Sequence, residues 1–330
     1  MTGSEIQELM ESVLQDAPYD HGELYSYHSR GYIRHHYDVN DEFRFGVEVE
    51  KEDEEGIDIC CRYQGNADDY LPFSWRAERD GSLSDEIGYE LISPIYNLTD
   101  LTKFTQHVQN PVLTALIMGG SSYSCGGHIT VSCERGTYDY VAKARQIAPL
   151  LHAMYPKRAK STGYAKFSTY DMLQNRNDKY SSIHLKGDCM EIRVFPQVKN
   201  VTQLLWRVQF VQLLMLFDKY YNRMQGRNAY QIATADELFA QVSKPESLLY
   251  KHLSAVYKKR MGEKLLLFKA YINLGEQLPL DFVTYSRTRK AIPTDLNVRV
   301  APHKTDGSDK TTQMSLFDVR DNFEDVPTEA

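Results

Sequence analysis

The strongest constraint on the fold is an eight-residue stretch in which apolar and polar side chains alternate without interruption. Residues 43–50 read Phe-Arg-Phe-Gly-Val-Glu-Val-Glu. A period of two predicts a β-strand with one buried face, because successive side chains of a strand point to opposite sides. The other face carries Glu48 and Glu50, whose spacing of about 6–7 Å suits hard cations. A solvated strand face is the alternative interpretation of such a pair.

Later segments repeat this pattern and are also predicted to be strands. They are Ile57–Tyr63, which would form a hairpin with the first strand, Phe73–Arg79, Tyr89–Pro94, His128–Cys133, and a hairpin of Ser181–Leu185 and Cys189–Phe195. If helices cover the apolar face, the open face collects Glu48, Glu50, Glu90, His128, Glu191 and Arg193. Carboxylates that hold Mg²⁺, next to an imidazole and a guanidinium, are suited to a nucleotide site. Each residue also has a purely structural interpretation. Glu48 and Glu50 could lie on a solvated face, and Glu90 could form a salt bridge. His128 could be a structural histidine, and Glu191 and Arg193 could form a cross-strand pair.

The remaining periodic segments predict helices, and together the elements predict an α+β fold. Helices are expected at residues 4–15, 99–118 with a break at Asn110-Pro111, 138–154, 201–224, and in three pieces over 234–275. Strict β-α-β alternation is absent, which favours a curved antiparallel sheet backed by helices on one face. We expect four segments: a lead-in at 1–40, a catalytic domain at 41–225, a helical extension at 226–287 and a flexible tail at 288–330.

Composition favours a soluble cytoplasmic protein. The chain has 330 residues, a formal net charge of −7 and five cysteines. No apolar run approaches the roughly 18 residues that a membrane span needs, and residues 1–5 are polar. The acidic balance gives no global bias toward nucleic acid, so neither a membrane nor direct contact with nucleic acid is expected.

Five short motifs, taken in order, resemble a known family. They are Phe45-Gly46-Val47-Glu48-Val49-Glu50, Asp80-Gly81-Ser82-Leu83, Tyr89-Glu90-Leu91-Ile92-Ser93-Pro94, Gly127-His128-Ile129-Thr130-Val131 and Glu191-Ile192-Arg193. Their order and spacing resemble the amidoligases, which are similar to glutamine synthetase and the glutamate–cysteine ligases. The resemblance covers roughly residues 43–215 and implies a glutamine synthetase-like sheet.

The resemblance also implies a reaction and roles for single residues. The reaction would be ATP-dependent: a carboxylate takes the γ-phosphoryl group, and an amine then attacks the acyl phosphate to form an amide. The implied Mg²⁺ or Mn²⁺ ligands are Glu48, Glu50, Glu90 and Glu191. His128 would lie near the nucleotide phosphates, Arg193 would contact the transferred group, and Asp80 and Ser82 would border the substrate. Further ATP contacts could come from Arg158, Lys166, Arg176 or Lys179, with Arg176 and Lys179 preferred. Thr130 stands where relatives often have a second histidine.

A separate motif lies near the end of the chain. Gln313-Met314-Ser315-Leu316-Phe317 resembles the Q-x-x-L-F peptide with which bacterial proteins bind the DNA sliding clamp. In such a peptide Leu316 and Phe317 would enter an apolar pocket and Gln313 would make a polar contact. A chance match, or a segment that docks on its own domain, is the alternative.

Three functions follow from these motifs. The first is a Mg²⁺- and ATP-dependent carboxylate–amine ligase. The second is a non-catalytic protein of the same fold that the tail recruits to a sliding clamp. The third is a metal-dependent phosphodiesterase or nuclease that uses the same carboxylates.

Overall fold

The computed structural model describes residues 1–17, 24, 35–37, 42–63, 71–134, 138–159, 165–166 and 180–274. Contacts group the chain into two compact units, one of residues 1–137 and 188–212 and the other of residues 138–187 and 213–330. These boundaries differ from those of the four predicted segments, whose functional division stays a prediction. None of the described helices has the length and apolar character needed to span a membrane.

The first unit is built around the predicted alternating strand, β2 (Phe43–Glu52). On one side β2 pairs with β6 (Gly127–Cys133), which in turn pairs with β8 (Cys189–Ile192). On the other side β2 pairs with β4 (Gly88–Ile92) and β5 (Ile95–Asn97). The outer neighbours are β3 (Arg76–Glu78) on β4 and β1 (His36–Tyr37) on β5. The β1–β5 pair is parallel and the others are antiparallel, so the open sheet is mixed rather than wholly antiparallel.

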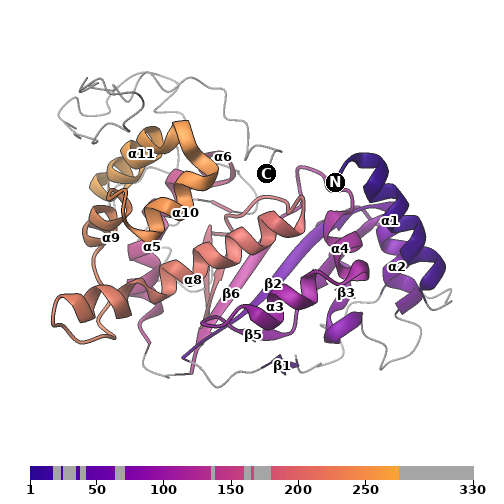
Figure 1. The fold of residues 1–330 in the computed structure, drawn as a ribbon, viewed down its shortest axis with the longest axis horizontal. Helices are drawn as coiled ribbons and strands as arrows, with labels where there is room; N and C mark the ends of the chain where they lie inside the picture. The colour runs from indigo at the N-terminus through magenta and orange to yellow at the C-terminus, as the bar shows by residue number, and fades with distance from the viewer. Residues whose placement is uncertain are drawn as a thin grey trace. The chain divides into compact units, whose positions relative to one another are not determined.

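Helices cover the apolar face of this sheet, as the alternation predicts. Phe45, Val47 and Val49 of β2 are fully buried. The Phe45 ring lies 5.1 Å from the Phe104 ring of α3 (Thr102–Val108), which crosses the strands in Figure 1. The hydroxyl of Tyr89 donates a hydrogen bond of 3.1 Å to the Leu116 carbonyl in α4 (Pro111–Met118). Arg44, Glu48 and Glu50 of β2 are therefore left on the opposite face, whereas Lys51 is buried on the covered face and donates to the Gly119 carbonyl at 2.8 Å.

The segment predicted as the second strand is a helix, α2 (Glu54–Tyr63). The Asp53 side chain accepts a hydrogen bond of 2.9 Å from the Gly56 amide, which satisfies a donor in the first helical turn. The buried residues Gly56, Ile59 and Cys60 follow helical spacing. Ile57-Asp58-Ile59 alternates by coincidence, and no hairpin forms between this segment and β2.

Smaller differences concern where elements begin and end. The predicted strand at 73–79 is a 3₁₀ turn, η2 (Pro72–Ser74), followed by β3. The strand predicted at 89–94 is β4, and a further short strand, β5, follows Pro94. The helix predicted from residue 99 begins three residues later, because α3 starts at Thr102, whose amide donates to the Asp100 carboxylate at 2.9 Å. The break at Asn110-Pro111 is confirmed, and Asn110 caps α4. The first unit also contains the predicted N-terminal helix, α1 (Gly3–Asp16).

The second unit is mainly helical. It contains α5 (Tyr140–Met154), α6 (Pro156–Ala159), β7 (Ile183–Lys186), α9 (Ala235–Val242), α10 (Leu248–Tyr257), the 3₁₀ turn η3 (Lys258–Arg260) and α11 (Met261–Leu274). The long helix α8 (Val201–Met224) begins in the first unit and ends in the second. Buried polar side chains link these helices: Lys143 of α5 donates to Asp218 of α8 at 2.6 Å, and Lys264 of α11 donates to the Met154 carbonyl at 3.0 Å.

Candidate metal centre on the polar face of the sheet

Strand register brings the predicted site residues to one face of the first unit's sheet. Glu48 on β2 lies opposite His128 on β6, and Glu50 lies opposite Glu90 on β4. Glu191 on β8 lies opposite Thr130, two residues after His128. Directly opposite residues of paired strands, and residues two apart on one strand, share a face. These five side chains therefore lie on one face of the sheet, as the alternating sequence pattern predicts.

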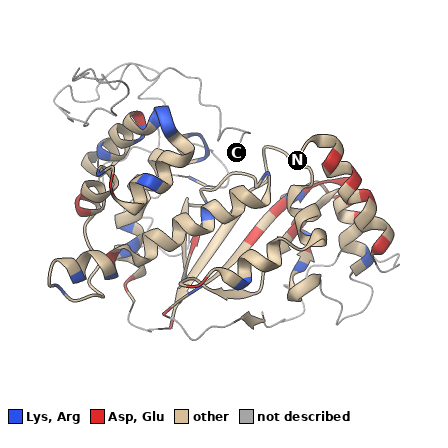
Figure 2. Cartoon of the chain, in the orientation of Figure 1, with Lys and Arg blue, Asp and Glu red and all other residues tan. Residues whose placement is uncertain are grey.

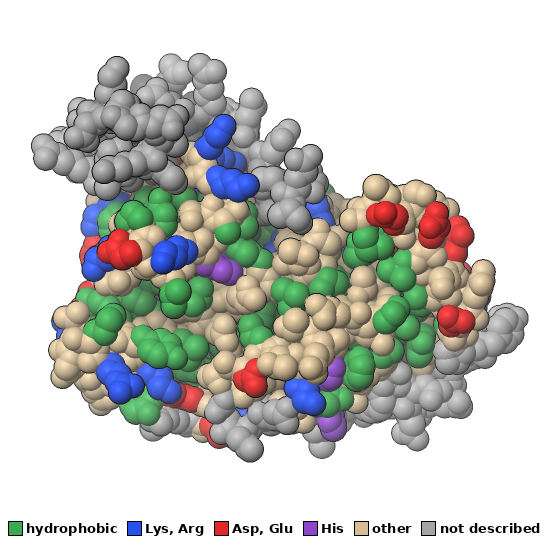
Figure 3. Space-filling view, in the orientation of Figure 1, with side chains coloured by type: hydrophobic (Ala, Val, Ile, Leu, Met, Phe, Trp, Pro, Cys, Tyr) green, Lys and Arg blue, Asp and Glu red, His purple; other side chains and the backbone are tan. Residues whose placement is uncertain are grey.

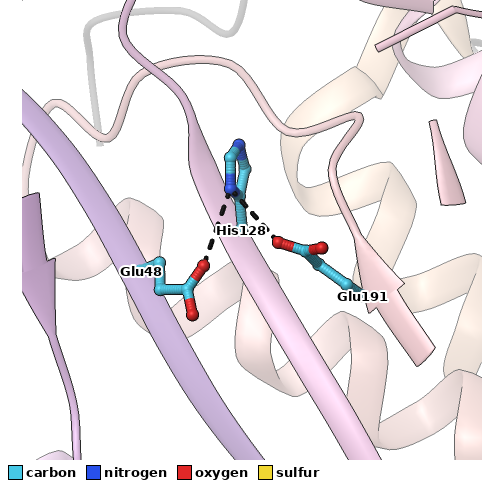
Figure 4. Close-up of side chains that lie close together, drawn as sticks. All are labelled: Glu48, His128 and Glu191. Atoms are coloured by element: carbon cyan, nitrogen blue, oxygen red, sulfur yellow. Dashed lines mark ion pairs between the residues drawn. The ribbon is translucent and has the colours of Figure 1, made fainter. Parts of the chain in front are cut away.

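His128 is the centre of this cluster. Its Nδ1 lies 3.9 Å from a Glu48 oxygen and 3.6 Å from a Glu191 oxygen, as Figure 4 shows. Its Nε2 lies 3.5 Å from a Glu50 oxygen. The imidazole is 3% exposed and Glu191 is fully buried, whereas Glu48 keeps partial contact with solvent. The ring thus has carboxylates beside both of its nitrogens.

Two sets of ligand atoms are close enough to hold a cation. One set is Glu48, His128 and Glu191, and the other is Glu50, Glu90 and His128; within each set the atoms lie within 4.8 Å of one another. Carboxylate oxygens with one imidazole nitrogen suit a divalent cation such as Mg²⁺ or Mn²⁺. A cluster of ion pairs around a protonated histidine uses the same side chains, so the charge balance has to be considered.

The candidate metal centre concentrates acidic side chains. Glu50, Glu90 and Glu191 are buried and, with Glu48, would carry four negative charges when ionised. His128 and Arg193 bring positive charge to this cluster, and the Arg193 Nη1 lies 2.8 Å from a Glu191 oxygen. Buried charges are costly unless they are paired. A divalent cation bound here would offset two of these negative charges.

Burial among other carboxylates also raises the pKa of Glu90. Burial raises the pKa of this carboxyl well above its usual range, and the negative charges of Glu48, Glu50, Asp80 and Glu78 raise it further. A carboxyl in this position takes up a proton or gains a cation, because either event removes the repulsion. Backbone contacts with Gly126 fix Glu50 beside it: the Gly126 amide donates to the Glu50 carboxylate, and the Glu50 amide donates to the Gly126 carbonyl.

The other predicted residues have different outcomes. Asp80 is close enough to act on Glu90 electrostatically, whereas Ser82 lies exposed in a turn where its amide donates to Asp80 at 2.8 Å. Their role at the substrate stays a prediction. Arg158 and Lys166 belong to the second unit. The preferred ATP contacts, Arg176 and Lys179, and the clamp-like residues Gln313, Leu316 and Phe317 lie outside the described residues.

Two residues of this face escaped the sequence analysis. Glu78 of β3 lies opposite Glu90, and Arg76 lies opposite Ile92, which itself lies opposite Glu48. Both side chains are buried, at 4% and 7% exposure. The alternation Trp75-Arg76-Ala77-Glu78 within a predicted strand does place Arg76 and Glu78 on one face. The sequence does not show, however, that this strand pairs with β4.

Comparisons with known proteins leave the family open. No protein-family model and no curated protein matches this chain.

Proposed function

We propose that this protein is a divalent-metal-dependent, ATP-consuming ligase that joins a carboxylate to an amine. The observation that carries the proposal is the convergence of Glu48, Glu50, Glu90, Glu191 and His128 on one face of the sheet. Those residues come from four strands and belong to four of the five motifs that resemble the amidoligases. The order of the motifs along the chain does not by itself require that their side chains lie close together in the fold. Their proximity on the sheet therefore supports the proposed ligase.

Four side chains of this face have a task in this reaction. Glu48, Glu191 and His128 would hold the cation, which when bound supplies positive charge for the phosphate oxygens of ATP. Arg193 is oriented by its contact with Glu191, and its guanidinium would stabilise negative charge on the phosphoryl group in transfer. The substrate carboxylate forms a bond to the γ-phosphorus while the bond to ADP breaks. The amine then attacks the acyl carbon, phosphate leaves, and the amine loses a proton.

The charge of the first unit favours small substrates over nucleic acid at this site. Residues 1–137 and 188–212 contain 27 Asp and Glu against 12 Lys and Arg. A net negative surround repels a polyanion, whereas ATP enters with its own divalent cation. The ligase is therefore preferred to the phosphodiesterase that could use the same carboxylates.

Trapping with hydroxylamine tests the proposal without knowledge of the natural amine. The full-length protein is incubated with Mg²⁺, ATP, hydroxylamine and a panel of amino acids, dicarboxylates and peptides, and hydroxamate and ADP are measured. We expect hydroxamate formation that requires both metal and ATP. Glu48→Ala and Glu191→Ala should reduce it by at least about 100-fold, because each removes a ligand of the cation that the transition state needs.

Glu86→Ala is the matched control, since it removes an exposed carboxylate of the same unit and should leave the rate unchanged. Circular dichroism establishes that each variant is folded. Full activity in Glu48→Ala and Glu191→Ala would contradict the proposal. Metal-dependent cleavage of DNA in the absence of ATP would replace the ligase with the phosphodiesterase.

A further inference from the structure

The net charge of −7 conceals a strong segregation between the two units. The first unit has a formal charge of −15, from 27 acidic and 12 basic residues. The second has +8, from 26 Lys and Arg against 18 Asp and Glu. Figure 2 shows Lys and Arg on the helices of the second unit. A charge averaged over the chain therefore says little about what either unit attracts.

Within the second unit, the basic residues gather on a few elements. The sequences of α5, α6, α10 and η3 contain eight Lys and Arg and not one Asp or Glu. Four lysines on these elements are exposed, namely Lys157 of α6, Lys251 of α10, and Lys258 and Lys259 of η3. We call these four side chains the basic surface.

Packing brings the four lysines into one region. The Tyr257 hydroxyl, at the end of α10, donates to the Met154 carbonyl at the end of α5, at 3.4 Å. Lys258 directly follows Tyr257, and Lys157 follows Met154 by three residues, so η3 and α6 are neighbours. Lys251 lies in α10, six residues before the last residue of that helix, so it is less than two helical turns from η3. Figure 3 shows Lys and Arg side chains near this end of the unit.

Within the described ranges, the four lysines of the basic surface have no ion-pair partner. Arg260 of η3 is paired with Glu263 at 3.1 Å, and the buried Lys143 is paired with Asp218. Among the residues that the structure describes, no carboxylate forms an ion pair with Lys157, Lys251, Lys258 or Lys259. Lys258 also has a φ of +23°, a backbone conformation that side-chain-bearing residues rarely adopt. An unusual backbone conformation and exposed lysines thus coincide at η3.

We propose that the basic surface binds the phosphate backbone of duplex DNA without reading its sequence. Lys251 lies about 9 Å along the helix axis from Tyr257, the residue before Lys258, at a rise of 1.5 Å per residue, so the basic surface is longer than a single phosphate. Lysine contacts to phosphate provide affinity and position but no base specificity. Single strands need several exposed aromatic rings for stacking, whereas Tyr140 and Tyr257 are buried here and Tyr250 of α10 is half-buried.

Fluorescence anisotropy with the full-length protein and a labelled 24-base-pair DNA duplex tests this proposal. We expect binding at 50 mM NaCl that weakens steeply by 200 mM, because phosphate contacts release counter-ions. Lys258→Glu/Lys259→Glu should lower the affinity at least about 10-fold and reduce the slope of log affinity against log salt by about 2, one for each lost contact. Two duplexes of unrelated sequence should bind equally.

The matched control is Lys103→Glu/Lys199→Glu, which makes the same change of charge at exposed lysines of the first unit. It should bind DNA like the wild type. The proposal is overturned if the wild type fails to bind at 50 mM NaCl, or if both double variants lose affinity equally. Displacement of DNA by polyglutamate at equal charge concentration would instead assign the surface to an acidic protein. If the η3 variant does not fold, Lys157→Gln/Lys251→Gln, on regular helical turns, provides the same comparison.

Discussion

His152 shows how burial fixes the charge of one residue. The side chain is fully buried in α5, and its Nε2 lies 2.7 Å from the hydroxyl of Ser182. Burial lowers the pKa of His152 from 6.5 to about 3, because the interior disfavours the charged imidazolium. The folded protein therefore holds this histidine neutral over most of the acid range.

The consequence is a specific loss of stability in acid. Between pH 6.5 and about 3 the unfolded chain takes up a proton at His152 and the folded chain does not, so the free energy of unfolding falls as the pH falls. The contribution is about 1.4 kcal/mol per pH unit, and up to about 5 kcal/mol over the whole interval. His152→Gln should lose this component. Urea unfolding of wild type and variant at pH 7, 6, 5 and 4.5 measures it.

The wild type is expected to lose stability faster than His152→Gln below pH 6.5, with parallel behaviour above it. His184→Gln, at a partly exposed histidine of β7, is the control and should follow the wild type. A constant difference between wild type and His152→Gln from pH 7 to 4.5 would show that this histidine is not held neutral.

Most residues of the candidate metal centre were predictable, and the exceptions have a common physical reason. Glu48, Glu50, Glu90, His128 and Glu191 each lie in a local alternation that identifies their face. Arg76 and Glu78 lie in an equally regular pattern, but their strand joins the site only through its pairing with β4. Strand order depends on contacts between distant segments, which a local period does not encode.

At the scale of elements, α2 depends on a glycine. A Cβ added to Gly56 would lie 2.6 Å from Cζ of Tyr89, a residue of β4 that is fully buried. The helix therefore approaches the strand closely at this point. Ile57-Asp58-Ile59-Cys60 fits both the helical and the extended period. The contact with Tyr89 and the cap from Asp53 decide between them, and neither is visible as a period.

Gly56→Ala should destabilise the protein by about 1–3 kcal/mol, although alanine is the better helix former by about 1 kcal/mol. The physical reason is overpacking against Tyr89. In Gly56→Ala/Tyr89→Phe the clash with the hydroxyl is gone, so the two losses should be less than additive. Chemical denaturation of the two single variants and the double variant gives the coupling energy.

Gly3→Ala is the control for the helix propensity alone, since a Cβ at Gly3 of α1 would meet no atom within 4 Å. That variant should be as stable as the wild type or slightly more so. Equal effects of Gly3→Ala and Gly56→Ala would contradict the close packing of α2 on β4.

At the scale of the whole molecule, a cation bound in the first unit should stabilise the fold. A ligand that binds only the folded state adds about 2.7 kcal/mol at 100 times its dissociation constant. We expect Mg²⁺ or Mn²⁺ at millimolar concentration to raise the melting temperature, whereas NaCl of equal ionic strength should not. Glu48→Gln should abolish the rise, because it removes a charged ligand of the cluster. Differential scanning fluorimetry measures the shift.

Glu86→Gln serves as its counterpart, because it removes an exposed carboxylate that is not part of the cluster. The rise should persist in this variant. An identical rise in Glu48→Gln and Glu86→Gln would mean that the cations only screen the acidic surface of the unit, and the assignment of the metal centre would be withdrawn.

The position of His128 between two sets of carboxylates links those sets through a single proton. A neutral imidazole has one nitrogen with a lone pair and one that carries hydrogen. If Nδ1 offers its lone pair to a cation between Glu48 and Glu191, Nε2 keeps its hydrogen and donates it toward Glu50. The reverse tautomer exchanges these roles. The two sets therefore cannot use a neutral His128 as a metal ligand at the same time. A cation bound in one set leaves the other set with a hydrogen-bond donor from His128 in place of a metal ligand.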